Sequence, residues 1–142
     1  MDRISKHISY AEATFSQTAI RKKIDNTPTK EQLASMVLVA EKCFEPVRNY
    51  FRVPIKISSF FRSEKLNIAI GGAKNSQHVK GEAIDIQATG EITNKMIFDY
   101  IKNNLEYDQL IWEYGDKNNP AWVHVSYSAK KNRKQILYVQ KI

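Results

Sequence analysis

A ten-residue stretch at residues 76–85 carries side chains that could bind a metal ion. It reads Ser-Gln-His-Val-Lys-Gly-Glu-Ala-Ile-Asp and places His78 seven residues before Asp85. A short loop can present the histidine and a strand can present the aspartate. These two residues need one more ligand to form a three-ligand zinc site with an open fourth position. His124, within Trp-Val-His-Val-Ser at residues 122–126, is the third candidate.

Alternating apolar residues indicate that Asp85 and His124 each lie on a strand. Successive side chains of a strand point to opposite faces, so Ile84 and Ile86 suit a buried core while Asp85 faces the other way. The valines on either side of His124 follow the same rule. If the two strands are neighbours, Asp85 and His124 would lie on the same face of the sheet. Gly81 permits a backbone bend or a close approach that a side chain would block.

The stretch has the form S-x-H-x-x-G-x-A-x-D and resembles the motif of a group of zinc peptidases. These are the D-alanyl-D-alanine carboxypeptidases and L-alanyl-D-glutamate endopeptidases, which include endolysins and are related to lysostaphin-type peptidases and the hedgehog signalling domain. Residues 57–67 are similar to the strand and the Tyr/Phe-Arg-Ser segment of the group. Residues 109–113 and 122–126 extend the similarity downstream, so that it covers roughly residues 8–127.

The resemblance implies roles for particular residues. Zinc would be held by His78, Asp85 and His124. Arg62 would face the substrate as a catalytic and binding residue, and Ser63 and Ser76 would contribute to substrate binding. Each role has a structural alternative. The two histidines and the aspartate could simply be hydrogen-bonded side chains, and Arg62 could lie over the two phenylalanines that precede it.

A peptidase of this kind also needs a carboxylate that moves a proton between water and the leaving amine. Many members of the group place it three residues before the last ligand, but here that position is Ala121. Glu113, at the end of the preceding expected strand, is the best substitute, because a short hairpin would bring it beside His124. Asp116 is the second candidate and Glu82 the third. Glu113 could instead be a solvated residue at a strand end.

Composition indicates one globular domain spanning residues 1–142. Hydrophobic residues make up 42% of the chain and charged residues 26%. There is no apolar run of about 18 residues, so no membrane span is expected. The first seven residues lack the apolar segment of a signal peptide. Cys43, the single cysteine, is expected to be a small buried hydrophobe that takes no part in catalysis.

The net charge of +7 favours polyanionic partners. Nucleic acid is not expected, because no binding motif and no aromatic-basic interleaving accompany the charge. An anionic cell wall fits the motif better, although a basic surface can also serve solubility alone.

The expected elements define an α+β fold, with a mainly antiparallel sheet and helices packed on it, as in the hedgehog and D-Ala-D-Ala-peptidase group. Ser9 with Glu12, Ser16, and Thr27 or Thr29 are expected to cap three helices, the last running to about Tyr50. Further helices are expected at residues 63–70 and from 93 to 105. Strands are expected at residues 55–59, 82–87, 109–113, 121–127 and 135–140.

The predicted function is hydrolysis of a peptide bond in bacterial peptidoglycan stem peptides by a zinc metallopeptidase. The protein is expected to be a monomer that is made in the cytoplasm, acts on the cell wall, and serves as a phage or prophage endolysin or a lytic component of a virion. The alternative is a relative without activity, which keeps zinc as a structural element of a virion or binding protein.

Overall fold

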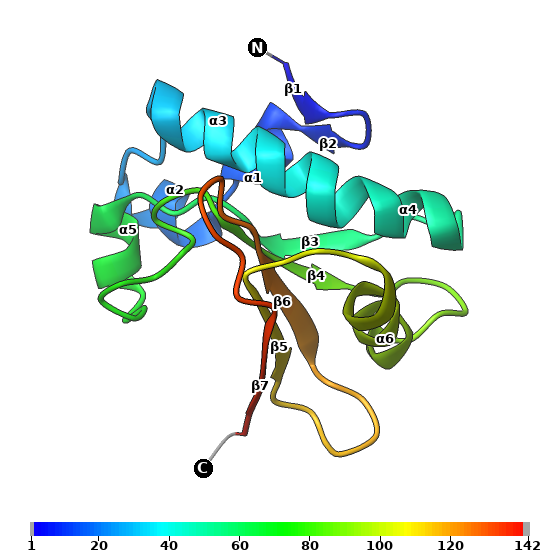
Figure 1. Cartoon of the computed structure of the whole chain (residues 1–142). Coiled ribbons are helices and arrows are strands. Elements are labelled where there is room, and N and C mark those ends of the chain that lie inside the picture. Colours follow the sequence, from blue (N-terminus) through cyan, green and yellow to red (C-terminus); the bar gives the residue numbers. More distant parts are fainter. Residues whose placement is uncertain (1, 141–142) are drawn as a thin grey trace.

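A computed structural model describes residues 2–140, which are built around a five-stranded sheet (Figure 1). The strands stand in the order β3–β4–β6–β5–β7. Their bounds are Lys56–Ser59 (β3), Ala83–Gln87 (β4), Gln109–Glu113 (β5), Trp122–Ser126 (β6) and Gln135–Val139 (β7). Neighbouring strands are antiparallel except β5 and β7, which are parallel. The predicted α+β class with a mainly antiparallel sheet is confirmed.

The register of the central strands places the chemistry-bearing residues on one face of the sheet. Asp85 on β4 lies directly opposite His124 on β6, and His124 lies opposite Ile111 on β5. Residues that pair in this way project to the same side, and side chains alternate along each strand. Asp85, His124 and Glu113, which is two residues beyond Ile111, therefore share one face.

A long helical run covers the opposite face. It consists of α3 (Lys30–Val39), a π-helical turn labelled η1 (Ala40–Phe44) and α4 (Glu45–Phe51). Its start is capped by Thr29, as predicted, in a reciprocal capping box with Gln32. The π turn was not predicted. It ends two residues before Pro46, whose missing N–H and bulky ring disturb the regular hydrogen bonding of the preceding turn.

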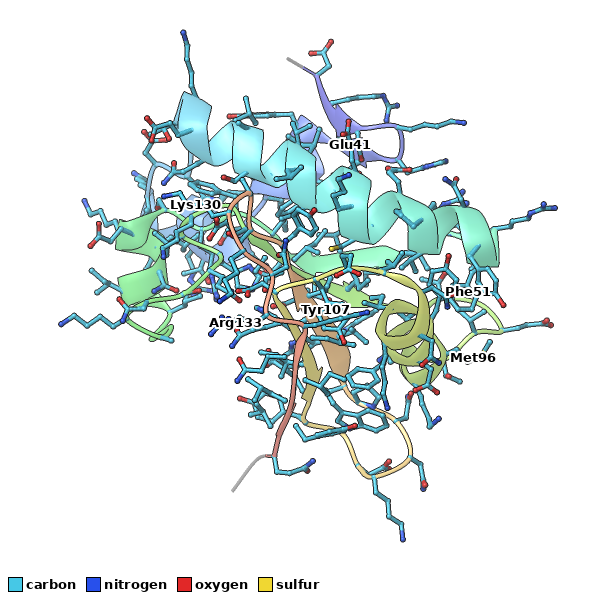
Figure 2. All side chains as sticks on the ribbon, viewed as in Figure 1. Glu41, Phe51, Met96, Tyr107, Lys130 and Arg133 are labelled. Carbon is cyan, nitrogen blue, oxygen red and sulfur yellow. The ribbon has the colours of Figure 1, made fainter. Side chains whose placement is uncertain are left out.

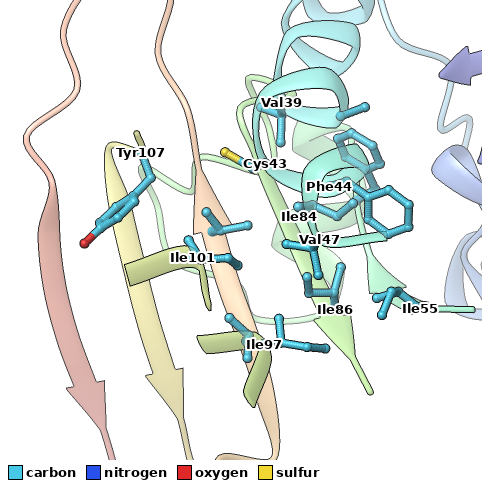
Figure 3. Packing of buried hydrophobic residues seen from close by; sticks show 14 of the residues in the cluster. Val39, Cys43, Phe44, Val47, Ile55, Ile84, Ile86, Ile97, Ile101 and Tyr107 are labelled. Atoms are coloured by element: carbon cyan, nitrogen blue, oxygen red, sulfur yellow. The ribbon is translucent and has the colours of Figure 1, made fainter. Parts of the chain in front are cut away.

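The hydrophobic core lies between this helical run, the sheet and α6 (Asn94–Asn104). In Figure 3, side chains from the helical run and from α6 surround the isoleucines of β4. The buried residues labelled there include Val39, Cys43, Phe44, Val47, Ile84, Ile86, Ile97 and Ile101. Burial raises the pKa of the Cys43 thiol to about 12, so the thiolate is strongly disfavoured and Cys43 behaves as the predicted small hydrophobe.

The N-terminal segment packs against this core and contains a hairpin that was not predicted. The hairpin comprises β1 (Arg3–Ser5) and β2 (Ile8–Ser9). The helices α1 (Tyr10–Thr14) and α2 (Gln17–Lys22) follow, capped by Ser9 and Ser16 as predicted. His7, between the two strands, makes a 2.6 Å contact through Nδ1 with Glu45 Oε1.

The loop that carries residues 76–82 follows α5 (Glu64–Ala69) and rests on α3. Gly81 has a φ of +74°, and a Cβ there would lie 2.5 Å from the carbonyl oxygen of Gln32. The Gln32 amide also donates a 3.0 Å hydrogen bond to the carbonyl of Val79. Glycine is therefore required where the loop meets the helix. Among residues 2–140, no helix is long and apolar enough to cross a bilayer.

Candidate active site

His78, Asp85 and His124 converge at the middle of the sheet. One potential ligand atom from each lies within 4.8 Å of the other two. The distance from His78 Nε2 to Asp85 Oδ2 is 3.2 Å, and from His124 Nδ1 to Asp85 Oδ1 it is 3.0 Å. Their side chains are 3%, 13% and 9% exposed, respectively, so the cluster is largely shielded from solvent. His78, Asp85 and His124 are together called the metal trio.

The metal trio has the donor chemistry that Zn²⁺ requires. His78 Nδ1 lies 2.7 Å from the carbonyl oxygen of Phe60, and a carbonyl only accepts, so this nitrogen carries the proton. In the neutral ring, Nε2 then directs its lone pair towards the Asp85 carboxylate. Two acceptors that face each other at this distance need a proton or a cation between them. The Nδ1–H bond to a backbone carbonyl is also typical of zinc-ligating histidines.

Electrostatics keep Asp85 ionised. Burial by itself would raise the pKa of this carboxyl. The neighbouring imidazole groups of His78 and His124 outweigh burial and hold the pKa of the Asp85 carboxyl well below its usual range. Asp85 therefore remains an anionic ligand group at neutral pH.

Glu113 lies beside the metal trio, where the hairpin between β5 and β6 brings it. Its Oε1 atom is 3.7 Å from His124 Nδ1, and its side chain is 18% exposed. Burial raises the pKa of the Glu113 carboxyl, and the negative charge of Asp85 raises it further. A carboxyl with a raised pKa next to a metal site is suited to accept and return a proton.

The two alternative carboxylates have other surroundings. Asp116 Oδ1 accepts hydrogen bonds from the backbone N–H groups of Asn118 and Asn119, at 2.8 and 3.0 Å, and so closes its own loop. Glu82 lines a cavity of about 450 Å³ together with Lys80, and the metal trio does not line that cavity. Of the three candidates, only Glu113 makes a contact with the metal trio among the described residues.

Arg62 and Ser76 form one unit next to the metal trio. The Arg62 guanidinium donates a 3.1 Å hydrogen bond from Nη2 to Ser76 Oγ, which also accepts from the backbone N–H of His78 at 3.2 Å. Burial lowers the pKa of Arg62, while the negative charges of Asp85 and Glu113 raise it, and the group stays charged. Within residues 2–140, the buried Nε of Arg62 has no hydrogen-bond partner.

Ser63 caps the start of α5. Its hydroxyl accepts from the backbone N–H of Leu66 at 3.2 Å and so caps α5, and its own N–H donates to Asn26 Oδ1 at 2.7 Å. A role in substrate binding would have to coexist with this cap.

Sequence reasoning missed Gln77, which contacts the metal trio, and also Asp108 and Arg133, which are linked to it through Gln77. Gln77 Oε1 lies 3.2 Å from His124 Nε2, and Gln77 Nε2 donates to Asp108, which Arg133 holds in turn. Gln77 could have been suspected because it precedes His78 directly. Nothing in the local sequence around Asp108 or Arg133 connects them with the metal trio.

One histidine from a loop and an aspartate and a histidine from neighbouring strands, with a carboxylate and a guanidinium beside them, have the composition of a zinc-dependent hydrolase site. A family model described as Peptidase M15 matches residues 6–126, and the chain belongs to this family. Peptidases of this family are zinc-dependent, so the protein is a zinc metallopeptidase. Among curated proteins no match was found.

Proposed function

We propose that this zinc metallopeptidase hydrolyses a peptide bond in bacterial peptidoglycan stem peptides, with zinc held by His78, Asp85 and His124. The carrying observation is the arrangement around the metal trio. A carboxylate, Glu113, lies on one side. Arg62 is close enough for the charges of Asp85 and Glu113 to act on it, and its buried Nε–H has no hydrogen-bond partner among residues 2–140.

Glu113 serves as the proton shuttle in this proposal. When bound, zinc polarises the scissile carbonyl and makes water more acidic. Glu113 takes the proton from the attacking water and delivers it to the leaving nitrogen. Its position 3.7 Å from His124 Nδ1 places it at the edge of the metal trio without the short contact that the Asp85 carboxylate makes.

Arg62 binds a substrate carboxylate or the developing oxyanion. A guanidinium offers a planar fork of donors that remains charged, which suits either group. It borders a cavity of about 380 Å³ whose wall includes the apolar side chains of Phe15, Leu66 and Ile70. The cavity combines the Arg62 cation with apolar and hydroxyl side chains, and the metal trio does not line it. The net charge of +7 adds a general attraction to anionic wall polymers.

Digestion of purified sacculi, followed by mass analysis of the fragments, tests this function. The zinc-loaded wild type is expected to release either free alanine, from carboxypeptidase action, or fragments cut within the stem between L-Ala and D-Glu. Glu113→Gln is the matched control, because it keeps the size of the side chain and removes its titrating group. Intact sacculi after treatment with the zinc-loaded wild type would contradict the proposal and favour a relative without this activity.

We further propose that the protein acts as a lytic enzyme of the phage endolysin type. The same cleavage would then lower the turbidity of bacteria whose walls are exposed to the purified protein. Cleavage of sacculi without any loss of turbidity would support a role in wall maturation instead of lysis.

A further inference from the structure

A chain of hydrogen bonds connects His124 with the surface on the side facing away from Asp85. His124 Nε2 lies 3.2 Å from Gln77 Oε1, and Gln77 Nε2 lies 3.0 Å from Asp108 Oδ2. Arg133 then binds Asp108 through three contacts: Nε to Oδ1 at 2.8 Å, Nη2 to Oδ2 at 2.9 Å, and the backbone N–H to Oδ1 at 3.1 Å. Gln77, Asp108 and Arg133 are called the support chain below.

We infer that the support chain sets the tautomer of His124, so that Nδ1 presents its lone pair to zinc. The inference rests on the proposed assignment of His124 as a zinc ligand. Gln77, Asp108 and Arg133 act through His124 and are positioning residues, because none of them belongs to the metal trio.

The order of donors and acceptors along the support chain allows one arrangement. Arg133 can only donate, and the Asp108 carboxylate can only accept. The Gln77 amide must therefore turn its NH₂ group towards Asp108, because the reverse orientation would set two oxygens against each other. Its oxygen then faces His124 Nε2 and accepts a hydrogen bond from the N–H group there. In a neutral ring, Nδ1 is left without a proton, and Nδ1 is the atom 3.0 Å from Asp85 Oδ1.

Burial and charge preserve the order of donors and acceptors along the support chain. The hydrogen bond from Arg133 holds the pKa of Asp108 below its usual range against the opposing effect of burial, so Asp108 stays an acceptor. The Asp108 side chain is 9% exposed, whereas that of Arg133 is 52% exposed. The support chain thus runs from a surface cation to a buried ligand, and charge-assisted bonds of this kind are stronger than neutral ones.

The backbone fixes the distances between the members of the support chain. Asp108 directly precedes β5; its N–H donates to the Ser126 carbonyl at 2.8 Å and its carbonyl accepts from Gln135 at 3.0 Å. Arg133 lies on the segment that leads from the turn at Lys130 into β7 (Figure 2). This segment lies beyond residues 6–126, which the family model matches. The segment that precedes β7 therefore reaches the support chain through Arg133, although it carries none of the three ligands.

Zinc affinity tests the inference. Gln77→Met keeps the length of the side chain and removes both its donor and its acceptor. We expect the zinc dissociation constant, measured by competition with a chelator, to rise by about 10- to 100-fold, as for other outer-shell partners of metal ligands. Asp108→Asn, which removes the fixed acceptor, should weaken zinc binding in the same direction. Lys134→Ala is the matched control, because it removes only the exposed 3.8 Å ion pair with Glu106, and it should bind zinc like the wild type.

A second measurement separates the tautomer from general damage to the fold. In zinc-loaded protein with ¹⁵N-labelled histidine, the Nε2–H proton of His124 should exchange slowly in the wild type and rapidly in Gln77→Met. Zinc affinity and proton exchange equal to the wild type in Gln77→Met would overturn the inference. His124→Ala provides the reference for the proposed site itself: if this variant keeps stoichiometric zinc, the ligand assignment fails, whereas zinc loss there with unchanged binding in Gln77→Met refutes the support chain alone.

Discussion

Replacement of Glu113 by glutamine is the sharpest test of the mechanism. The substitution keeps the shape and hydrogen-bonding capacity of the side chain but removes the group that titrates. General acid–base catalysis contributes about 10²- to 10⁴-fold in rate. The structure favours the upper part of this range, because Asp85 belongs to the metal trio and Asp116 is bound by two backbone N–H groups of its own loop. No nearby carboxylate among the described residues is left to substitute for Glu113.

In energy, a loss of about 10³- to 10⁴-fold corresponds to roughly 4–5 kcal/mol of transition-state stabilisation. The assay is kcat/KM for stem-peptide cleavage, with zinc content and thermal unfolding measured on the same samples. Both of these are expected to match the wild type, since Glu113 is not in the metal trio and the neutral amide suits its buried position.

Asp116→Asn is the matched control for this experiment. Its side-chain oxygen can still accept from Asn118 and Asn119, so we expect near-normal activity. Full activity in Glu113→Gln together with loss in Asp116→Asn would transfer the proton shuttle to the loop. Full activity in both variants would refute the reasoning that identifies a base from its distance to the metal trio.

Three other perturbations have defined outcomes. Arg62→Lys keeps the charge but loses the planar fork, so kcat/KM should fall by roughly 10²- to 10³-fold; an unchanged value would reduce Arg62 to a packing role. Gly81→Ala combines a φ of +74° with a Cβ placed 2.5 Å from a backbone oxygen and should cost roughly 2–5 kcal/mol of unfolding free energy in urea. Its control, Gly90→Ala, has a φ of +67° but open space, and should cost only about 1–2 kcal/mol. Burial alone would raise the pKa of Glu45, but hydrogen bonds from His7 and Ser5 lower it below its usual value. The ionised Glu45 carboxylate therefore stabilises the fold at pH values above the pKa it has in the unfolded chain. This stabilisation is lost as the pH falls through the lower pKa that Glu45 has in the folded protein. Thermal melts from about pH 6 down to about pH 3 should therefore show the advantage of the wild type over Glu45→Gln shrinking with acid, and a constant difference would contradict the assignment.

Local sequence was sufficient to predict most helices and strands of the site. The capping residues Ser9, Ser16 and Thr29 start helices because their side chains satisfy backbone N–H groups a few positions away. Alternating valines and isoleucines predict which face of a strand is buried, and this placed Asp85 and His124 on the opposite face. These are short-range effects, so a single chain is enough to recognise them.

Features that depend on distant partners were missed or incomplete. The hairpin of β1 and β2 is stabilised by contacts with α1, α3 and η1, and its two short strands carry little pattern of their own. The contact between His7 and Glu45 joins residues 38 positions apart. The parallel pairing of β7 with β5 depends on the path of the segment after β6, which periodicity does not determine.

The sequence by itself determined the type of site. A histidine and an aspartate seven residues apart, a glycine between them and a later histidine in an apolar strand are enough to indicate a metal site, because ligand chemistry and strand alternation are local properties. Only the tertiary structure decided the surroundings of that site. The sheet register brings Glu113 within 3.7 Å of His124, and the path of the segment before β7 brings Arg133 to Asp108, 25 positions earlier in the chain. Such contacts depend on which strands pair and in which register, and many residues of the core determine that pairing together.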